Sequence, residues 1–94
     1  MKSVEFGAYI KAQREEKRIP QRIVAHALNV DTSTLSKMEL GERQILISQV
    51  KPLSEILNID FKALQIKYIS DNIISDFSGQ PYLKEALKIT EQKI

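Results

Sequence analysis

The stretch from Pro20 to Gly41 most constrains the fold that this chain can adopt. Its sequence is PQRIVAHALNVDTSTLSKMELG, in which a polar segment separates two runs of apolar residues at helical spacing. In the second run Leu35 and Met38 lie three residues apart, so they share one face of a helix. That face can pack on the apolar face of the first run, which carries Ile23, Val24 and Ala27. The stretch therefore predicts two short helices that pack together across a tight turn.

Residues with distinct backbone preferences mark the turn and the two ends of the second helix. Asn29 tolerates the left-handed conformation that a sharp turn often needs. Asp31 suits an N-cap, because its carboxylate can accept from backbone N–H groups two or three residues further on. Gly41 is a natural helix stop. The second helix is expected to span about Thr32 to Leu40. Its outer side is small and polar enough to enter the major groove of DNA, and it carries Thr32, Ser33, Thr34 and Lys37.

The same residues resemble the helix-turn-helix of the phage repressor and Cro-like (XRE-like) family of transcriptional regulators. The matching positions are Gln21, Ala25 and Val30, followed in the second helix by Ser33, Leu35, Ser36, Lys37, Glu39 and Gly41. The resemblance extends without a gap from about Phe6 to Leu64. Two positions depart from it, since Asn29 stands where the family usually has glycine and Ile45 where proline is common. The resemblance implies an all-α fold, a five-helix repressor-like DNA-binding domain with a C-terminal helical extension.

The resemblance also implies roles for individual residues. Gln21 is expected to contact the DNA backbone and to brace the recognition helix, while Arg43 is expected to reach phosphates from the loop after that helix. Arg14 is expected to pair with Glu39, which would tie the first helix to the recognition helix. The full set of expected DNA-binding residues is Gln21, Arg22, Thr32, Ser33, Thr34, Lys37, Arg43 and Gln44. The alternative for each is an ordinary surface or helix-capping residue, and for Arg14 and Glu39 an exposed, unpaired charge.

The segment before the helix-turn-helix predicts a helix from Val4 to Lys17. Ser3 is a plausible N-cap for it. Phe6 and Ile10 are expected to face inward, together with Ala12–Gln13.

The segment after the recognition helix predicts a fourth helix, whose apolar stripe would be Ile47, Val50, Leu53, Ile56 and Leu57. Pro52 disrupts a helix interior, so either the regular helix begins near Lys51 or its first turn is distorted. Asn58 is expected to cap the end of this helix, and Asp60 to cap a fifth helix that starts at Phe61.

The chain is divided into a helix-turn-helix domain over residues 1–65 and a helical extension over residues 66–94. A helical apolar pattern continues to about Asp76, the breaker SGQP follows, and a last amphipathic helix ends the chain. The extension holds too many large apolar residues for a solvated linker. It would fold back on its own domain or pair with a second subunit, and dimerisation is favoured.

Composition excludes several classes of protein. The chain has no cysteine and one histidine, His26, which excludes a disulfide, a thiolate metal site and a site built from several histidines. His26 is expected on the solvent side of its helix, and the sequence offers no catalytic constellation. We therefore expect that the chain is not an enzyme and that it binds no cofactor, metal or small-molecule ligand. The sequence lacks an apolar run long enough for a membrane span and a signal-peptide pattern, which favours the cytoplasm.

The charge balance is only weak support for nucleic-acid binding. The net charge is +2, and the excess falls in residues 1–43, which hold eight Lys and Arg against six Asp and Glu. We expect a sequence-specific transcriptional regulator that binds double-stranded DNA as a homodimer on a palindromic operator. A restriction–modification controller, a phage-type repressor and an antitoxin all fit this architecture. The alternative is a helical protein-interaction module that keeps the fold without reading DNA.

Overall fold

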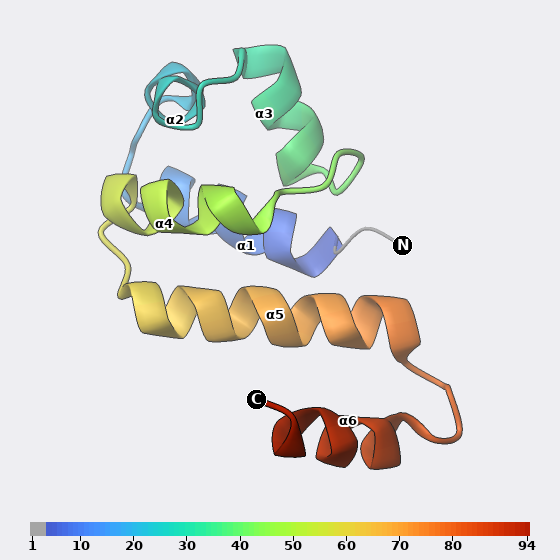
Figure 1. The fold of residues 1–94 in the computed structure, drawn as a ribbon. Coiled ribbons are helices and arrows are strands. Elements are labelled where there is room, and N and C mark those ends of the chain that lie inside the picture. Colours follow the sequence, from blue (N-terminus) through green and yellow to red (C-terminus); the bar gives the residue numbers. More distant parts are fainter. Residues whose placement is uncertain (1–3) are drawn as a thin grey trace.

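The computed structural model describes residues 4–94, and over this range the chain forms six helices and no strand (Figure 1). The helices are α1 (Val4–Glu16), α2 (Gln21–Ala27), α3 (Thr32–Glu39), α4 (Ile47–Ile56), α5 (Phe61–Phe77) and α6 (Leu83–Gln92). The predicted all-α fold is confirmed, and most helix boundaries agree with the prediction to within one residue. Ser3, the expected N-cap of the first helix, lies outside the described residues.

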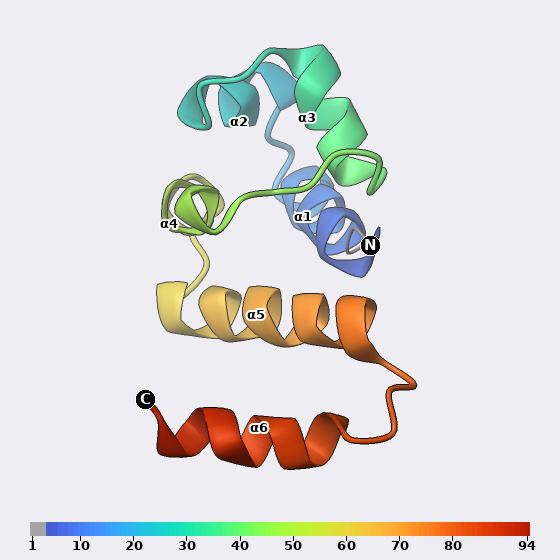
Figure 2. The same cartoon turned by 45° about the vertical axis from the view of Figure 1, so that its right-hand side comes forward.

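The helices stack from one end of the molecule to the other. Figures 1 and 2 show α2 and α3 at one end, α1 and α4 in the middle, and α5 running alongside them. The last helix, α6, lies beyond α5 at the far end. The first five helices share one apolar core, which is made of Phe6, Ile10, Val24, Ala25, Leu28, Leu35, Met38, Ile45, Val50, Leu53, Leu57, Leu64 and Tyr68.

Four helices end in the same backbone motif. The second residue after the helix has a positive φ in each case: 57° at Arg18, 60° at Asn29, 78° at Gly41 and 53° at Asn58. The next backbone N–H then reaches back five residues, as Val30 does to Ala25 (3.0 Å), and satisfies a free carbonyl of the last turn. The predicted left-handed turn at Asn29 is confirmed. It lets the chain reverse between α2 and α3 within four residues.

The fourth helix begins at Ile47 and runs through Pro52 without a break. The alternative in which it begins near Lys51 is therefore wrong. Its first turn is closed by a side chain, because the backbone N–H of Leu46 donates to Oε1 of Gln49 over 2.8 Å. This contact adds a capping bond that the sequence interpretation had not included.

The apolar stripe of α4 differs from the prediction at its first residue. Ile47 is 51% exposed, while Ile45, which precedes the helix, is only 5% exposed. The Tyr68 hydroxyl of α5 donates to the Ile45 carbonyl, and the Tyr68 ring meets the Phe6 ring edge-on at 5.0 Å. These contacts draw Ile45 into the core and leave Ile47 facing solvent. The loop after α3 is thereby attached to α5.

The inner face of α1 also differs slightly from the prediction. Phe6 and Ile10 are buried as expected, but Ala12 is exposed and Gln13 is half-buried. Arg14 is buried instead, because its side chain turns toward α3.

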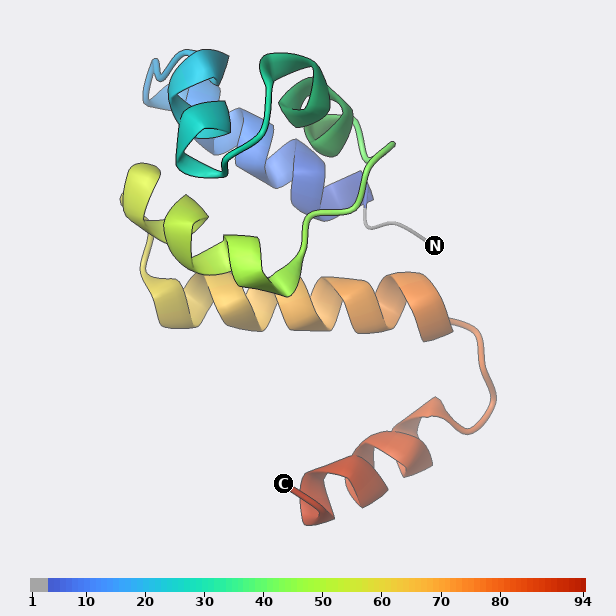
Figure 3. The same cartoon turned by 45° about the horizontal axis from the view of Figure 1, so that its top comes forward.

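The C-terminal extension is helical, as predicted, but α6 is not packed into the body. None of its residues, all of which the structure describes, is buried. Figure 3 shows α6 set apart from the other helices, beyond the loop at 78–82 that follows α5. Among the helices of residues 4–94, none has both the length and the apolar character needed to cross a membrane.

Candidate nucleic-acid interface

The recognition helix α3 starts at an N-cap on Asp31, as the sequence predicted. Oδ1 of Asp31 accepts a hydrogen bond of 2.7 Å from the backbone N–H of Thr34. The side chains of Thr32 and Ser33 are exposed, and that of Thr34 is half-buried. Because Asp31 supplies the cap, the hydroxyls of Thr32 and Ser33 are not required for it and face the solvent side of the helix.

The pKa of the Asp31 carboxyl shows that this surface is positively charged nearby. The hydrogen bonds from Thr34 lower the pKa of the Asp31 carboxyl, and the positive charges of Lys37 and Arg43 lower it further. Lys37 and Arg43 are both exposed. Two of the predicted DNA contacts, one from the helix and one from the following loop, thus act on the same carboxylate and lie on one surface.

The lowered pKa of Asp31 predicts a specific acid sensitivity. Its contribution to stability is present above the ordinary carboxyl pKa of about 3.9 and is lost as the pH falls through the lower, folded-state value. Asn also caps helices, so Asp31→Asn should keep α3 at neutral pH while removing part of the stability loss below about pH 4. Thermal unfolding of both proteins between pH 2.5 and pH 7, values chosen to bracket roughly that window, measures the effect. Identical pH profiles would contradict the assignment.

The other end of α3 is held by a buried ion pair. Nε and Nη2 of Arg14 donate to the two carboxylate oxygens of Glu39 over 2.7 and 3.1 Å, and Nη1 of Arg14 donates to the Ile19 carbonyl over 3.1 Å. Glu39 is 3% exposed and Arg14 is 8% exposed. The pair that the sequence predicted is thus present, and it fixes α1 against α3. Its hydrogen bonds with Glu39 raise the pKa of Arg14 and keep the guanidinium charged.

Gln21 joins the same network from the start of α2. Its Nε2 donates to Oγ of Ser36 and to Oε1 of Glu39, each over 3.0 Å, and Oγ of Ser36 donates back to its Oε1 over 3.3 Å. The expected bracing of the recognition helix by Gln21 is therefore present in the structure. Both amide hydrogens of Gln21 are engaged, so contact of this amide with a phosphate would require one of these bonds to open.

The loop after α3 is closed onto the helix. The backbone N–H groups of Glu42 and Arg43 both donate to the Lys37 carbonyl, over 2.9 and 3.2 Å. These two N–H groups are therefore occupied and are not available to a phosphate. The Arg43 side chain remains exposed, so it is the part of this loop that can meet a phosphate.

Three further exposed residues lie in different surroundings. Arg22 lines a shallow groove between α2 and α4 with His26 and Ile56. Gln44 is exposed, and its side chain lies near the hydroxyl of Tyr68. Burial raises the pKa of Tyr68, and the neighbouring Gln44 side chain partly offsets this effect. Leu40 is 56% exposed at the end of α3. The structure thus brings together Thr32, Ser33, Lys37 and Arg43, while contacts of Arg22 and Gln44 with DNA stay predictions.

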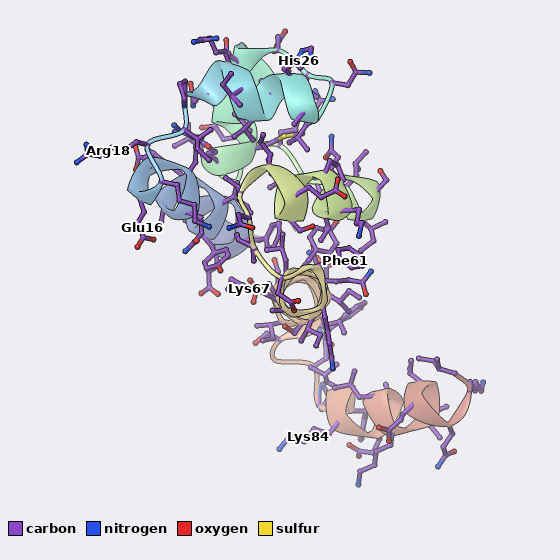
Figure 4. The ribbon with its side chains drawn as sticks, turned by 90° about the vertical axis from the view of Figure 1, so that its left-hand side faces the viewer. Glu16, Arg18, His26, Phe61, Lys67 and Lys84 are labelled. Atoms are coloured by element: carbon purple, nitrogen blue, oxygen red, sulfur yellow. The ribbon has the colours of Figure 1, made fainter. Side chains whose placement is uncertain are left out.

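The remaining polar side chains suggest no additional chemistry. His26 lies on the outer side of α2, as predicted, at the opposite end of the molecule from Lys84 (Figure 4). Among residues 4–94 no three His, Cys, Asp or Glu side chains gather in a way that could hold a metal ion. The features that the sequence interpretation missed, the closed loop and the Ile45–Tyr68 contact, leave no local pattern in the sequence.

Comparisons with known proteins agree with this geometry. A family model described as helix-turn-helix matches residues 10–64, which is more than half of the chain and includes α2, α3 and the loop that follows them. Neither the curated proteins nor the solved structures gave a match. The family consists of DNA-binding regulators in which the second helix of the motif reads the major groove. This chain belongs to the helix-turn-helix family, as an XRE-like DNA-binding transcription regulator.

Proposed function

We propose that the chain is a sequence-specific regulator that binds a palindromic operator as a homodimer, with α3 in the major groove. The observation that carries this proposal is the contrast between the two sides of α3. Its inner side is fixed by the buried Arg14–Glu39 pair and by Gln21, while its outer side presents exposed Thr32, Ser33 and Lys37. A rigidly held helix with free polar side chains is what base recognition requires.

The proposed contacts follow from the chemistry of these side chains. The hydroxyls of Thr32 and Ser33 can hydrogen-bond base edges, and the threonine methyl can meet a thymine methyl. Lys37 lies one helical turn beyond Ser33 and can reach guanine acceptors. Arg43 can pair with a phosphate and set the register of the helix on the duplex. Two copies related by a two-fold axis would then read half-sites one DNA turn, about 34 Å, or a multiple of it apart.

We further propose that such binding controls transcription by occupying DNA at a promoter. An operator that overlaps the polymerase site would give repression. A restriction–modification controller, a phage-type repressor and an antitoxin are the roles that fit a chain of this architecture.

Ser33→Ala combined with Lys37→Ala should abolish sequence preference while leaving weak general DNA binding. Selection from random DNA should enrich one palindromic site with the wild-type protein. The double variant should bind that site about 30-fold more weakly or worse, because each of the two lost base contacts contributes about 1–3 kcal/mol of discrimination. Mobility-shift titrations at two salt concentrations measure both the affinity and its salt dependence.

The matched control is Lys84→Ala, which removes the same charge at the opposite end of the molecule (Figure 4). It should leave the selected site and the affinity nearly unchanged. Enrichment of no site by the wild-type protein would overturn the proposal. It would favour a protein-interaction module, for which the exposed apolar residues of α5 and α6 are the specific support.

A further inference from the structure

The outer face of α5 carries an apolar stripe that the body of the protein does not cover. Ile66, Ile69, Ile73 and Phe77 follow one another at spacings of three and four residues, so they lie on one side of the helix. Ile66, Ile69 and Phe77 are 58%, 45% and 51% exposed. The opposite side of α5 carries Leu64 and Tyr68, which are buried against the core.

The helix α6 carries a second stripe, made of Leu83, Ala86 and Leu87, and Ile94 follows just beyond the end of the helix. Leu87 is 42% exposed and Ile94 is 98% exposed. Between the two stripes lies an open, mostly apolar groove of about 580 Å³, whose walls include Ile73, Phe77, Leu83 and Leu87. Figure 4 shows α6 extending away from α5, which is seen end-on, so the two helices do not close on each other.

We propose that a second copy of this chain fills the groove. In this dimer two α5 helices pack antiparallel through their stripes, and each α6 closes over the α5 of the other copy. The proposal deepens the homodimer part of the proposed function. It places the dimer interface at the end of the molecule away from α3, so the recognition helix stays uncovered (Figures 1 and 2).

The charges along α5 favour a second copy over an unrelated partner. Lys62 and Asp76 are exposed and lie near the two ends of the stripe, with Ile69 midway between them. When two such helices run antiparallel about Ile69, Lys62 of each copy faces Asp76 of the other. The surface is therefore complementary to itself, as an interface between identical subunits must be.

The size of the uncovered surface also fits a dimer. Six large apolar or aromatic residues of α5, α6 and the segments on either side of α6 are between 42% and 98% exposed: Ile66, Ile69, Phe77, Tyr82, Leu87 and Ile94. If each fully exposed side chain has roughly 150–200 Å² of accessible surface, these six expose about 600 Å² per chain. Each partner in a standard interface buries about 800 Å². Polar neighbours such as Lys62 and Ser70 supply the remainder. In the dimer Ile66 of the second copy would enter the groove beside Ile73.

Sedimentation equilibrium in the absence of DNA tests the proposal. The wild-type protein should have twice the 10.8 kDa mass of one chain. Leu87→Asp places a charge in the groove and should raise the dimer dissociation constant about 30-fold or more. Because α6 buries no residue in the single chain, this change should leave the fold of the helix-turn-helix intact. Ile89→Asp makes the same change on α6 outside the groove lining and should have little effect.

A disulfide test locates the two-fold axis. The natural chain has no cysteine, so any disulfide comes from the introduced residue. Residue 69 lies at the proposed axis, so the Ile69→Cys variant should form a covalent dimer on mild oxidation. Ile74 is 58% exposed on another side of α5, so the Ile74→Cys variant should not.

A monomeric wild-type protein at high concentration would overturn the proposal, and so would equal effects of Leu87→Asp and Ile89→Asp. Equal crosslinking at positions 69 and 74 would overturn the proposed pairing. Because these measurements contain no DNA, failure of operator selection with a confirmed dimer would count against the proposed function alone. A monomer that still selects a site would count against the dimer alone.

Discussion

Glu39→Gln is expected to lower the free energy of unfolding by about 3–5 kcal/mol, the range measured when one partner of a buried ion pair is removed. The substitution keeps the shape of the side chain but removes the charge that both Arg14 and Gln21 contact. The guanidinium of Arg14 would then remain in the core without a counterion, because its side chain is only 10% exposed. Urea denaturation followed by circular dichroism measures the change.

Two further variants separate the charge effect from other causes. Glu55→Gln makes the same chemical change at an exposed position of α4 and should alter stability by no more than about 0.5 kcal/mol. Arg14→Met combined with Glu39→Leu removes both charges and should recover much of the loss, since apolar replacements of a buried pair are often tolerated. A loss below about 1 kcal/mol for Glu39→Gln would show that the pair is not effectively buried.

Gly7→Ala is the second substitution for which we expect a large effect. It should lower the free energy of unfolding by at least about 2 kcal/mol. Helix propensity alone predicts the opposite sign, because alanine is favoured over glycine by about 0.8–1.0 kcal/mol inside a helix. However, α1 and α3 meet backbone to backbone at this point. A Cβ on Gly7 would overlap the carbonyl oxygen of Met38 and lie 3.1 Å from that of Glu39. Neither atom can turn aside as a flexible side chain would, so steric overlap outweighs propensity.

The neighbouring residue supplies the control for this prediction. Ala8 is exposed on the same helix, and Ala8→Gly should cost about 1 kcal/mol through propensity alone. Both variants are compared by urea denaturation. Stabilisation by Gly7→Ala would mean that α1 and α3 separate at little cost, and the close approach would then have no structural importance.

The helix-turn-helix could be predicted from the sequence because its signals are local. The N-cap at Asp31 and the left-handed residue at Asn29 act on backbone groups no more than five residues away. The apolar spacing of Leu35 and Met38 is likewise a property of one helix. Such interactions operate in the same way wherever the segment lies in the fold, so the sequence pattern alone was sufficient.

The candidate site was predicted unevenly for the same reason. The Arg14–Glu39 pair spans 25 residues, and only the resemblance to a family suggested it. Contacts of Arg22 and Gln44 with DNA stay predictions, because both side chains are exposed. Only the folded chain shows that Arg22 lies at the groove between α2 and α4 and that Gln44 lies near the hydroxyl of Tyr68. These outcomes depend on which distant side chain offers a hydrogen bond or a contact, and spacing along the chain carries no such information.

By itself the sequence determined the helices, the sharp turn between α2 and α3, and the polar face of α3, because these depend on backbone preferences and on periodicity over a few residues. Tertiary structure alone decided that Ile45 enters the core instead of Ile47, that α4 runs through Pro52, and that Gly7 must lack a side chain. The physical reason is that burial and close approach depend on surfaces that meet only after the chain has folded. A residue's neighbours in space then decide its environment, whatever its neighbours in sequence favour.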